Sequence, residues 1–180
     1  LNVLRNYSVK HPEDKDSALR LAKVQIASGN PGEIGQGMEL LWTLADQDDA
    51  LGLQTLEYIV TLTSITPDDT TRLIDRLKIH PKADDRHYVT ALQREVKQSP
   101  HRKKEIVATA AVKYRDKKRN ELLPFVRWLI EEGEPLQVLT ILPEEDAKVH
   151  QGLLENYLNA LTMLNRFGDV ERLVNDPKIK

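Results

Sequence analysis

The chain has 180 residues, with 26 lysines and arginines against 28 aspartates and glutamates, a formal net charge of −2 and no cysteine. The near-neutral total argues against a polybasic nucleic-acid-binding protein and against an acidic disordered tail. The lack of cysteine excludes disulfides, cysteine nucleophiles, iron–sulfur clusters and thiolate zinc sites. With 40% hydrophobic residues, the chain can form the core of one domain or of a continuous array of small units.

The sequence carries no membrane-spanning or targeting pattern. No stretch approaches the roughly 20 consecutive apolar residues of a transmembrane helix, and the first residues lack a signal-peptide pattern. Because residue 1 is Leu1, we expect a fragment or a processed product. We therefore expect a soluble segment without membrane insertion, either cytoplasmic or a soluble region of a membrane-tethered protein. The sequence identifies neither the compartment nor the oligomeric state.

Apolar residues recur at helical spacing along most of the chain. Residues 1–15 read as an N-terminal extension, and residues 16–180 as a single helical domain. The periodic apolar residues predict ten helices, centred on 19–26, 38–45, 53–60, 73–77, 88–96, 106–114, 122–130, 138–142, 154–164 and 170–174. Residues 58–66 are rich in β-branched side chains and are also compatible with a strand. We expect a helix up to about Leu62 there, because an isolated strand would have no partner.

Several segments have the composition of helix ends. Gly29-Asn30-Pro31-Gly32 predicts the end of the first helix. Thr66-Pro67 and Ser99-Pro100 each combine a hydroxyl side chain that can cap a helix with a proline at its first position. Pro143 is followed by three acidic residues, which stabilise the positive end of the helix dipole. Each of the last three segments predicts a helix start.

Taken two by two, the predicted helices form five pairs that begin near Asp16, Asp49, Ala83, Asn120 and Val149, in steps of 33, 34, 37 and 29 residues. This period is typical of helix-turn-helix repeats. The turn at Glu132-Gly133-Glu134-Pro135 recurs about 32 residues later as Asn165-Arg166-Phe167-Gly168-Asp169.

On these features the chain resembles the tetratricopeptide-repeat (TPR) superfamily, loosely over residues 16–176 and best over 128–139 and 160–173. Both stretches have a first helix, a glycine-type turn and a second helix that opens with a small or aliphatic residue. The chain departs from the pattern because no repeat has all of the family's positions, and Val138 and Val170 stand where the family prefers alanine. The resemblance implies a right-handed α-α superhelix, a TPR-like solenoid of about five divergent helix pairs.

The patterns that would indicate a catalytic, metal or cofactor site are each incomplete. Asp84-Asp85-Arg86-His87 is the densest cluster of metal-ligand types, but it lies at a predicted helix start, where acids serve as caps. Asp46, Asp48 and Glu57 match part of a calcium loop that lacks its required ligand and glycine. Gly35-Gln36-Gly37 lacks the third glycine of a phosphate-binding loop and is more consistent with close helix approach or a late helix start. We expect no enzyme activity and no cofactor.

Charge is unevenly distributed along the chain. Residues 24–71 hold eight acidic residues and no lysine or arginine, a balance of −8, whereas residues 97–119 hold nine basic and two acidic residues, a balance of +7. The basic block includes a dense run of possible nucleic-acid contacts: Lys113, Arg115, Lys117, Lys118 and Arg119. Its single aromatic residue, Tyr114, belongs to the apolar stripe of a helix, so the block lacks a base-stacking platform. Nucleic-acid binding is therefore the less favoured alternative.

The sequence favours a non-enzymatic scaffold that binds a peptide or protein on the concave surface lined by the first helix of each pair. Arg127, Asn156 and Asn159 are the candidate contact residues, because they are polar positions within otherwise apolar first helices. A further alternative is a helical accessory domain of a larger protein.

Overall fold

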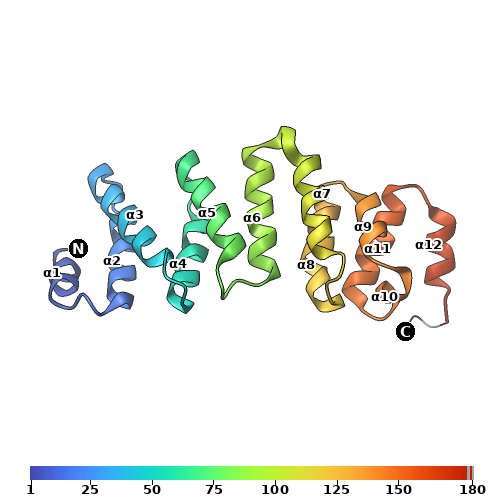
Figure 1. Cartoon of the computed structure of the whole chain (residues 1–180), viewed down its shortest axis with the longest axis horizontal. Helices are drawn as coiled ribbons and strands as arrows, with labels where there is room; N and C mark the ends of the chain where they lie inside the picture. The colour runs from blue at the N-terminus through green and yellow to red at the C-terminus, as the bar shows by residue number, and fades with distance from the viewer. Residues whose placement is uncertain (178, 180) are drawn as a thin grey trace. The chain divides into compact units, whose positions relative to one another are not determined.

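The computed structural model describes residues 1–177 and residue 179, apart from the side chain of Asn120. These residues form α-helices and one short 3-10 helix, without any strand, which confirms the all-α class (Figure 1). The first five helices are α1 (Asn2–Lys10), α2 (Lys15–Ala27), α3 (Pro31–Ala45), α4 (Ala50–Thr61) and α5 (Pro67–Ile79). The others are α6 (Asp85–Gln98), the 3-10 helix η1 (Pro100–Arg102), α7 (Lys103–Tyr114), α8 (Arg119–Glu131), α9 (Pro135–Ile141), α10 (Glu144–Lys148), α11 (Gln151–Met163) and α12 (Phe167–Val174).

The chain divides into two compact units. Unit 1 is Leu1–Ala83 and contains α1 to α5, and unit 2 is Asp84–Lys180 and contains α6 to α12. The division lies between Ala83 and Asp84, whereas the sequence suggested one boundary after residue 15. Residues 2–10 of the predicted extension form helix α1, which packs against α2.

The helices follow the predicted pairing closely. Consecutive first helices of the pairs begin 32 to 35 residues apart. These first helices are α2, α4, α6, α8 and α11, which begin at Lys15, Ala50, Asp85, Arg119 and Gln151. These positions lie within two residues of the predicted starts. Each first helix contacts the second helix of its pair, respectively α3, α5, α7, α9 and α12. The five-residue helix α10 is an addition between the fourth and fifth pairs.

Thr66 caps helix α5 as the sequence indicated. Its Oγ1 accepts a hydrogen bond from the Asp69 backbone N–H at 3.0 Å. Asn30, within the segment predicted to end the first helix, also caps α3, and its Oδ1 accepts a hydrogen bond from Gly32 N–H at 2.9 Å. Ser99 is an exception, because its side chain makes no capping bond and the chain enters η1 before α7 begins. Helix α4 ends at Thr61, so the helical alternative for residues 58–66 is correct up to the expected position.

Of Gly35 and Gly37 in α3, Gly37 has the first of the two expected roles. A Cβ atom on Gly37 would lie 2.9 Å from Ala22 O and 2.9 Å from Ile26 Cγ1, so this glycine allows α2 and α3 to approach closely. The alternative of a late helix start is wrong, because α3 already begins at Pro31.

Each unit has its own apolar core. In unit 1 the largest fully buried side chains are Leu41, Leu56, Ile59, Leu73 and Leu77. In unit 2 the core contains a row of aromatic rings: Tyr114 stacks on Phe125 with ring centroids 4.1 Å apart, and Phe125 lies 5.5 Å from Trp128. Because these rings come from α7 and α8, they join the third helix pair to the fourth.

Polar contacts between pairs repeat the period of the helices. Arg5 donates two hydrogen bonds to the Glu33 carboxylate, at 2.8 and 2.6 Å. Further contacts between residues 26 to 33 positions apart include Lys15–Gln47, Trp42–Asp69, Arg72–Asp46, Arg76–Asp48, His80–Gln47, Lys103–Glu132, Arg119–Asp146 and Arg172–Glu144. Within each unit, neighbouring helix pairs are therefore held together by hydrogen bonds and ion pairs as well as by apolar packing.

Buried His80 fixes the end of α5 against the loop between α3 and α4. Its Nδ1 lies 3.1 Å from Lys82 N, whose N–H is a donor, so Nδ1 accepts and Nε2–H donates to Gln47 O at 3.0 Å. Gly52 leaves room for this contact, since a Cβ atom there would lie 2.0 Å from Gln47 O and 3.2 Å from His80 Nε2.

The substitution Gly52→Ala tests this close contact. We expect it to lower the free energy of unfolding by about 2 kcal/mol, because the added methyl group overlaps the Gln47 carbonyl and the loop must move. Gly35→Ala is the matched control, because its Cβ meets nothing within 4 Å and alanine favours the helix by about 1 kcal/mol. Urea denaturation of both variants measures the difference, and equal stability would contradict the proposed role of Gly52.

Candidate functional site

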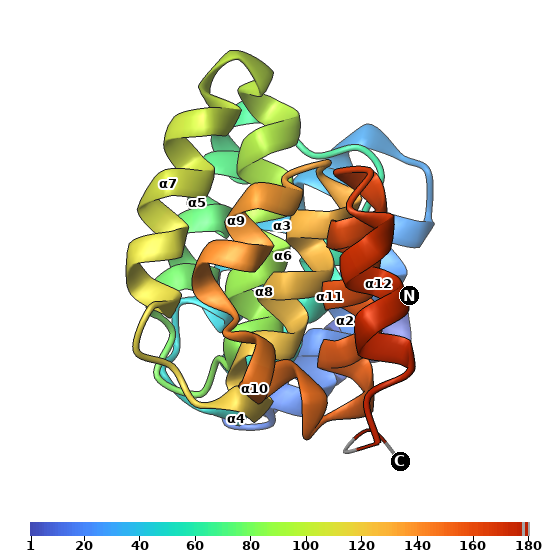
Figure 2. The same ribbon diagram turned by 90° about the vertical axis from the view of Figure 1, so that its right-hand side faces the viewer.

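The first helices of unit 2 lie next to one another. Helix α6 contacts α8, and α8 contacts α11, while the second helices α7 and α9 contact each other. Figure 2 shows α7 and α9 together on one side of α8. Three consecutive first helices thus form a layer whose outer side carries exposed polar side chains. We call the exposed side chains of α6, α8 and α11 the first-helix face.

The three candidate contact residues differ in exposure. Arg127 on α8 and Asn159 on α11 are exposed and belong to the first-helix face. Asn156 is buried, so it does not contribute to this face. Its side-chain Nδ2–H donates to Gly152 O at 2.6 Å, one turn earlier in the same helix, which satisfies the buried amide.

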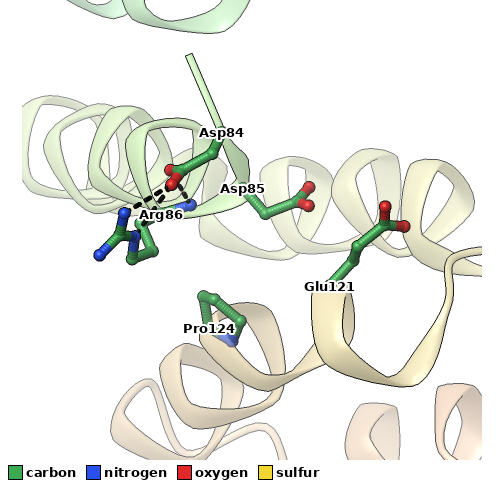
Figure 3. A pocket seen from close by; sticks show the side chains of 5 residues that line it. All are labelled: Asp84, Asp85, Arg86, Glu121 and Pro124. Carbon is green, nitrogen blue, oxygen red and sulfur yellow. Dashed lines mark hydrogen bonds and ion pairs between the residues drawn. The ribbon is translucent and has the colours of Figure 1, made fainter. Parts of the chain in front are cut away.

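A pocket of about 200 Å³ opens between the start of α6 and the start of α8. Figure 3 shows its lining residues, with Asp84, Asp85 and Arg86 at the beginning of α6 and Glu121 and Pro124 on α8. Arg127 follows Pro124 by three residues and therefore lies on the same side of α8. The pocket is part of the first-helix face and carries three carboxylates and one guanidinium group.

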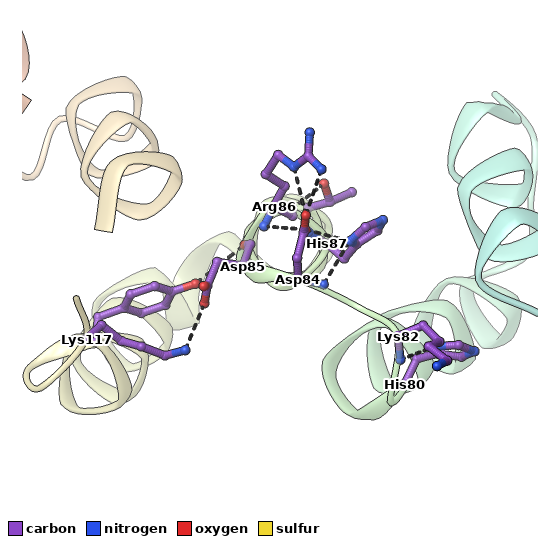
Figure 4. Close-up of polar contacts among 9 residues, drawn as sticks. His80, Lys82, Asp84, Asp85, Arg86, His87 and Lys117 are labelled. Atoms are coloured by element: carbon purple, nitrogen blue, oxygen red, sulfur yellow. Dashed lines mark hydrogen bonds and ion pairs between the residues drawn. The ribbon is translucent and has the colours of Figure 1, made fainter. Parts of the chain in front are cut away.

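Asp84 caps helix α6. Its Oδ1 accepts hydrogen bonds from the backbone N–H groups of Arg86 at 2.9 Å and His87 at 3.3 Å. Its Oδ2 accepts two more from the Arg86 guanidinium, at 3.0 and 2.7 Å (Figure 4). Partial burial raises the pKa of Asp84, but these bonds and the nearby His87 ring outweigh burial and lower the pKa to about 2. The carboxylate is thus held ionised as a structural cap.

Asp85 and Glu121 share one cation. Lys117 Nζ lies 3.5 Å from Asp85 Oδ1 (Figure 4). It also lies 3.6 Å from Glu121 Oε2, so Lys117 joins α6 to the start of α8. The pocket therefore presents carboxylate oxygens that can accept hydrogen bonds from a bound donor group. The i, i+4 spacing of Lys117 and Glu121 is visible in the sequence, whereas the approach of Asp85 depends on the packing of α6 against α8.

The predicted basic patch has few free charges. Lys117 pairs with Asp85 and Glu121, Arg119 Nε donates to Asp146 Oδ1 at 2.6 Å, and Lys113 Nζ lies 3.3 Å from the centre of the Tyr88 ring. The side chains of Arg115 and Lys118 are exposed. Because the first three cations already have anionic or aromatic partners, the patch presents less positive charge than the sequence suggested.

Part of the acidic block, residues 24–71, is also paired within unit 1. Asp46 forms an ion pair with Arg72, Asp48 lies 3.1 Å from Arg76 Nη2, and Glu33 binds Arg5. All three arginines lie outside residues 24–71. Asp46 and Asp48 thus pair with arginines, and Glu57 lies within helix α4. The three carboxylates therefore do not form the ligand set of a calcium-binding loop.

Across the described part of the chain, no group of three or more histidine, aspartate or glutamate side chains is placed to hold a metal ion. The described helices also include none with the length and apolar composition needed to cross a bilayer. No family model matches the sequence, and no curated protein or solved structure shows significant similarity to it.

The substitution Asp84→Ala tests the role of the ionised cap. Because the pKa of Asp84 in the folded chain is about 2, below the ordinary 3.8, its charge stabilises the fold fully above about pH 4, and this contribution is lost as the pH falls toward 2. We expect the variant to lose about 1 kcal/mol at pH 7 and the difference from wild type to shrink near pH 2.5. Denaturant unfolding of wild type and variant at both pH values measures this difference in the free energy of unfolding.

Asp116→Ala is the control for this pH series, because Asp116 is an exposed residue in the turn after α7. It should leave stability nearly unchanged at both pH values. A loss in Asp84→Ala that is equal at pH 7 and pH 2.5 would show that the charge of Asp84 contributes nothing to the cap.

Proposed function

We propose that the chain is a non-enzymatic helical-repeat scaffold that binds a peptide or protein segment along the first-helix face of unit 2. The observation that carries this proposal is the direct contact of successive first helices, α6 with α8 and α8 with α11. This contact produces one continuous surface from helices that are far apart in the sequence. A surface of this kind, presented by stacked helix pairs, is suited to binding an extended partner.

We also propose that the helix pairs form a TPR-like solenoid of about five pairs with a right-handed superhelical course. The spacing of 32 to 35 residues between pairs and the contacts between neighbouring pairs of one unit support this arrangement. Two turns add to this support. Gly133 and Asn165, 32 residues apart, both adopt positive φ angles, of 73° and 57°. The residue after each donates its N–H to the carbonyl five positions earlier, Glu134 to Leu129 at 2.8 Å and Arg166 to Leu161 at 2.9 Å.

Two groups on the face are suited to contact a partner. Arg127 is exposed and, within the described residues, its guanidinium has no ion-pair or hydrogen-bond partner. A bound carboxylate or carbonyl can therefore use its donors without displacing an internal contact. The pocket beside Pro124 offers carboxylate oxygens for a donor side chain. We propose that the bound segment places an acceptor at Arg127 and a donor in the pocket.

Nucleic-acid binding is less well supported than peptide binding. The ion pairs of Lys117 and Arg119 would have to break before these cations neutralised phosphates, and each broken pair would reduce the gain from counterion release. The role of an accessory domain in a larger protein is compatible with the same binding face.

Selection from a random peptide library tests the proposal. Peptides selected with the wild-type chain should bind Arg127→Ala at least tenfold more weakly, because truncation of a central interface arginine typically costs more than about 1 kcal/mol. Arg115→Ala is the matched control, since Arg115 is an exposed arginine outside the first-helix face. Fluorescence anisotropy with labelled peptides measures both affinities.

Site-specific photocrosslinking locates the bound peptide. A benzophenone amino acid at Asn159 on α11 should crosslink to the peptide, whereas the same group at exposed Thr109 on the second helix α7 should not. Crosslinks at Thr109 alone, or equal loss of affinity in both arginine variants, would contradict binding on the first-helix face.

A further inference from the structure

The first helices of unit 2 carry exposed polar side chains at one equivalent position. Counted from the first residue of each helix, the ninth residues of α6, α8 and α11 are Gln93, Arg127 and Asn159. All three are exposed. Within the described residues, none of their side chains has a hydrogen-bond or ion-pair partner. We call Gln93, Arg127 and Asn159 the polar row.

Unit 1 shows that side chains at this position reach one another across neighbouring first helices. The ninth residues of α2 and α4 are Lys23 and Tyr58, and Lys23 Nζ lies 4.7 Å from the centre of the Tyr58 ring. In unit 1 a cation–π contact therefore occupies the position. In the described part of unit 2 no such contact closes the polar row, so its side chains can bind another molecule.

Contacts of α8 show that its two neighbours begin beside its own start. Asp85 of α6 and Glu121 of α8 line one pocket. A Cβ atom on Gly152, the second residue of α11, would lie 3.2 Å from Leu123 Cδ1 of α8. The ninth residue of each helix lies about 12 Å beyond its first residue. The polar row therefore crosses the three helices instead of following one of them.

The spacing of the polar row fits an extended chain. Packed neighbouring helices lie about 8 to 10 Å apart, and an extended chain advances about 3.3 Å per residue. Each step along the row therefore corresponds to about three residues, and the whole row to about seven. A helical partner fits less well, because its backbone N–H and C=O groups are bonded within the helix and leave no partner for the amides of Gln93 and Asn159.

The three side chains differ in what they can bind. The amides of Gln93 and Asn159 each have a donor and an acceptor, so they can bond both polar groups of a main chain. The Arg127 guanidinium has donors only and carries a positive charge. In the described structure Glu131, one turn later on α8, forms no ion pair with it. A carboxylate is the strongest partner for such a group.

We propose that the polar row binds an extended acidic segment that lies across α6, α8 and α11. Gln93 and Asn159 bond the main chain of the segment, and Arg127 bonds one aspartate or glutamate carboxylate between them. This inference rests on the peptide-binding function proposed above and adds the conformation, length and charge of the bound segment. Because two of the three contacts go to the main chain, the segment needs an acidic residue at one position and tolerates many side chains elsewhere.

Selection from a library of random peptides of about ten residues tests the charge of the segment. Peptides selected with the wild-type chain should be enriched in aspartate or glutamate at one position. Selection with Arg127→Glu should instead enrich lysine or arginine there, because the variant reverses the charge that the segment meets. Arg115→Glu is the matched control and should keep the acidic preference, since Arg115 is exposed and lies outside the first-helix face.

N-methylation of single backbone amides in a selected peptide tests the main-chain contacts. A methyl group about three residues to either side of the acidic residue should weaken binding about fivefold or more, because it removes a main-chain donor. Methyl groups at the residues between should have less effect. Fluorescence anisotropy with labelled peptides measures each affinity.

The amide side chains of the row are tested in the protein itself. Gln93→Ala and Asn159→Ala should each weaken binding about fivefold, and each should remove the sensitivity to N-methylation on its own side of the acidic residue. Gln54→Ala is the matched control, since Gln54 is an exposed amide on α4 of unit 1. Because all three side chains are exposed, circular dichroism should show unchanged helix content in each variant.

The outcomes separate this inference from the proposed function. If Arg127→Ala weakens binding but the selected peptides show no acidic preference, or N-methylation has no effect with a period of about three residues, the first-helix face binds peptides and the inference about the row is wrong. A library without any binder, or an affinity unchanged by Arg127→Ala, contradicts the proposed function and this inference together.

Discussion

The mutual burial of neighbouring helix pairs is the constraint on which the rest of this structure depends. One pair of helices presents more apolar surface than it can cover by itself, and within each unit the pairs are stabilised by contact with their neighbours. Tyr114 of α7 and Phe125 of α8 illustrate this, because the stacked rings belong to successive pairs and both are fully buried. Polar contacts such as Arg5–Glu33 and Arg172–Glu144 follow the same period.

This constraint also explains the electrostatics of the chain. Along the sequence, acidic and basic residues form separate blocks, but stacking brings residues about 30 positions apart into contact. Arg72 and Arg76 thereby reach Asp46 and Asp48, and Arg119 reaches Asp146. Lys148 lies between Glu144, Glu145 and Asp176, with nitrogen–oxygen distances of 2.8 to 3.0 Å, and the hydrogen bonds raise its pKa. Acidic and basic residues that are far apart in the sequence thus neutralise one another in part when the helices stack.

The sequence predicts local features of this fold well, because helix caps and apolar periodicity act over one or two turns. The starts at Thr66 and Asp84 and the five pairs follow from such signals. Helix α1 was not predicted, because it buries no side chain and its sequence therefore lacks the apolar stripe of a packed helix. Asn156 is polar in sequence yet buried, since a carbonyl of its own helix satisfies its amide. Asp85 and Glu121 line the same pocket only because α6 packs against α8, so the pocket could not be predicted from the sequence.

Contacts limited to neighbouring pairs have a consequence for the folding of each unit. The polar contacts between pairs close loops of only 26 to 33 residues, as for Trp42–Asp69 and Lys103–Glu132. The entropy cost of loop closure rises with loop length, so these contacts cost less to form than contacts between more distant parts of the chain. We therefore expect folding within a unit to begin at any one pair and to spread by addition of the next, at the fast rates typical of low contact order.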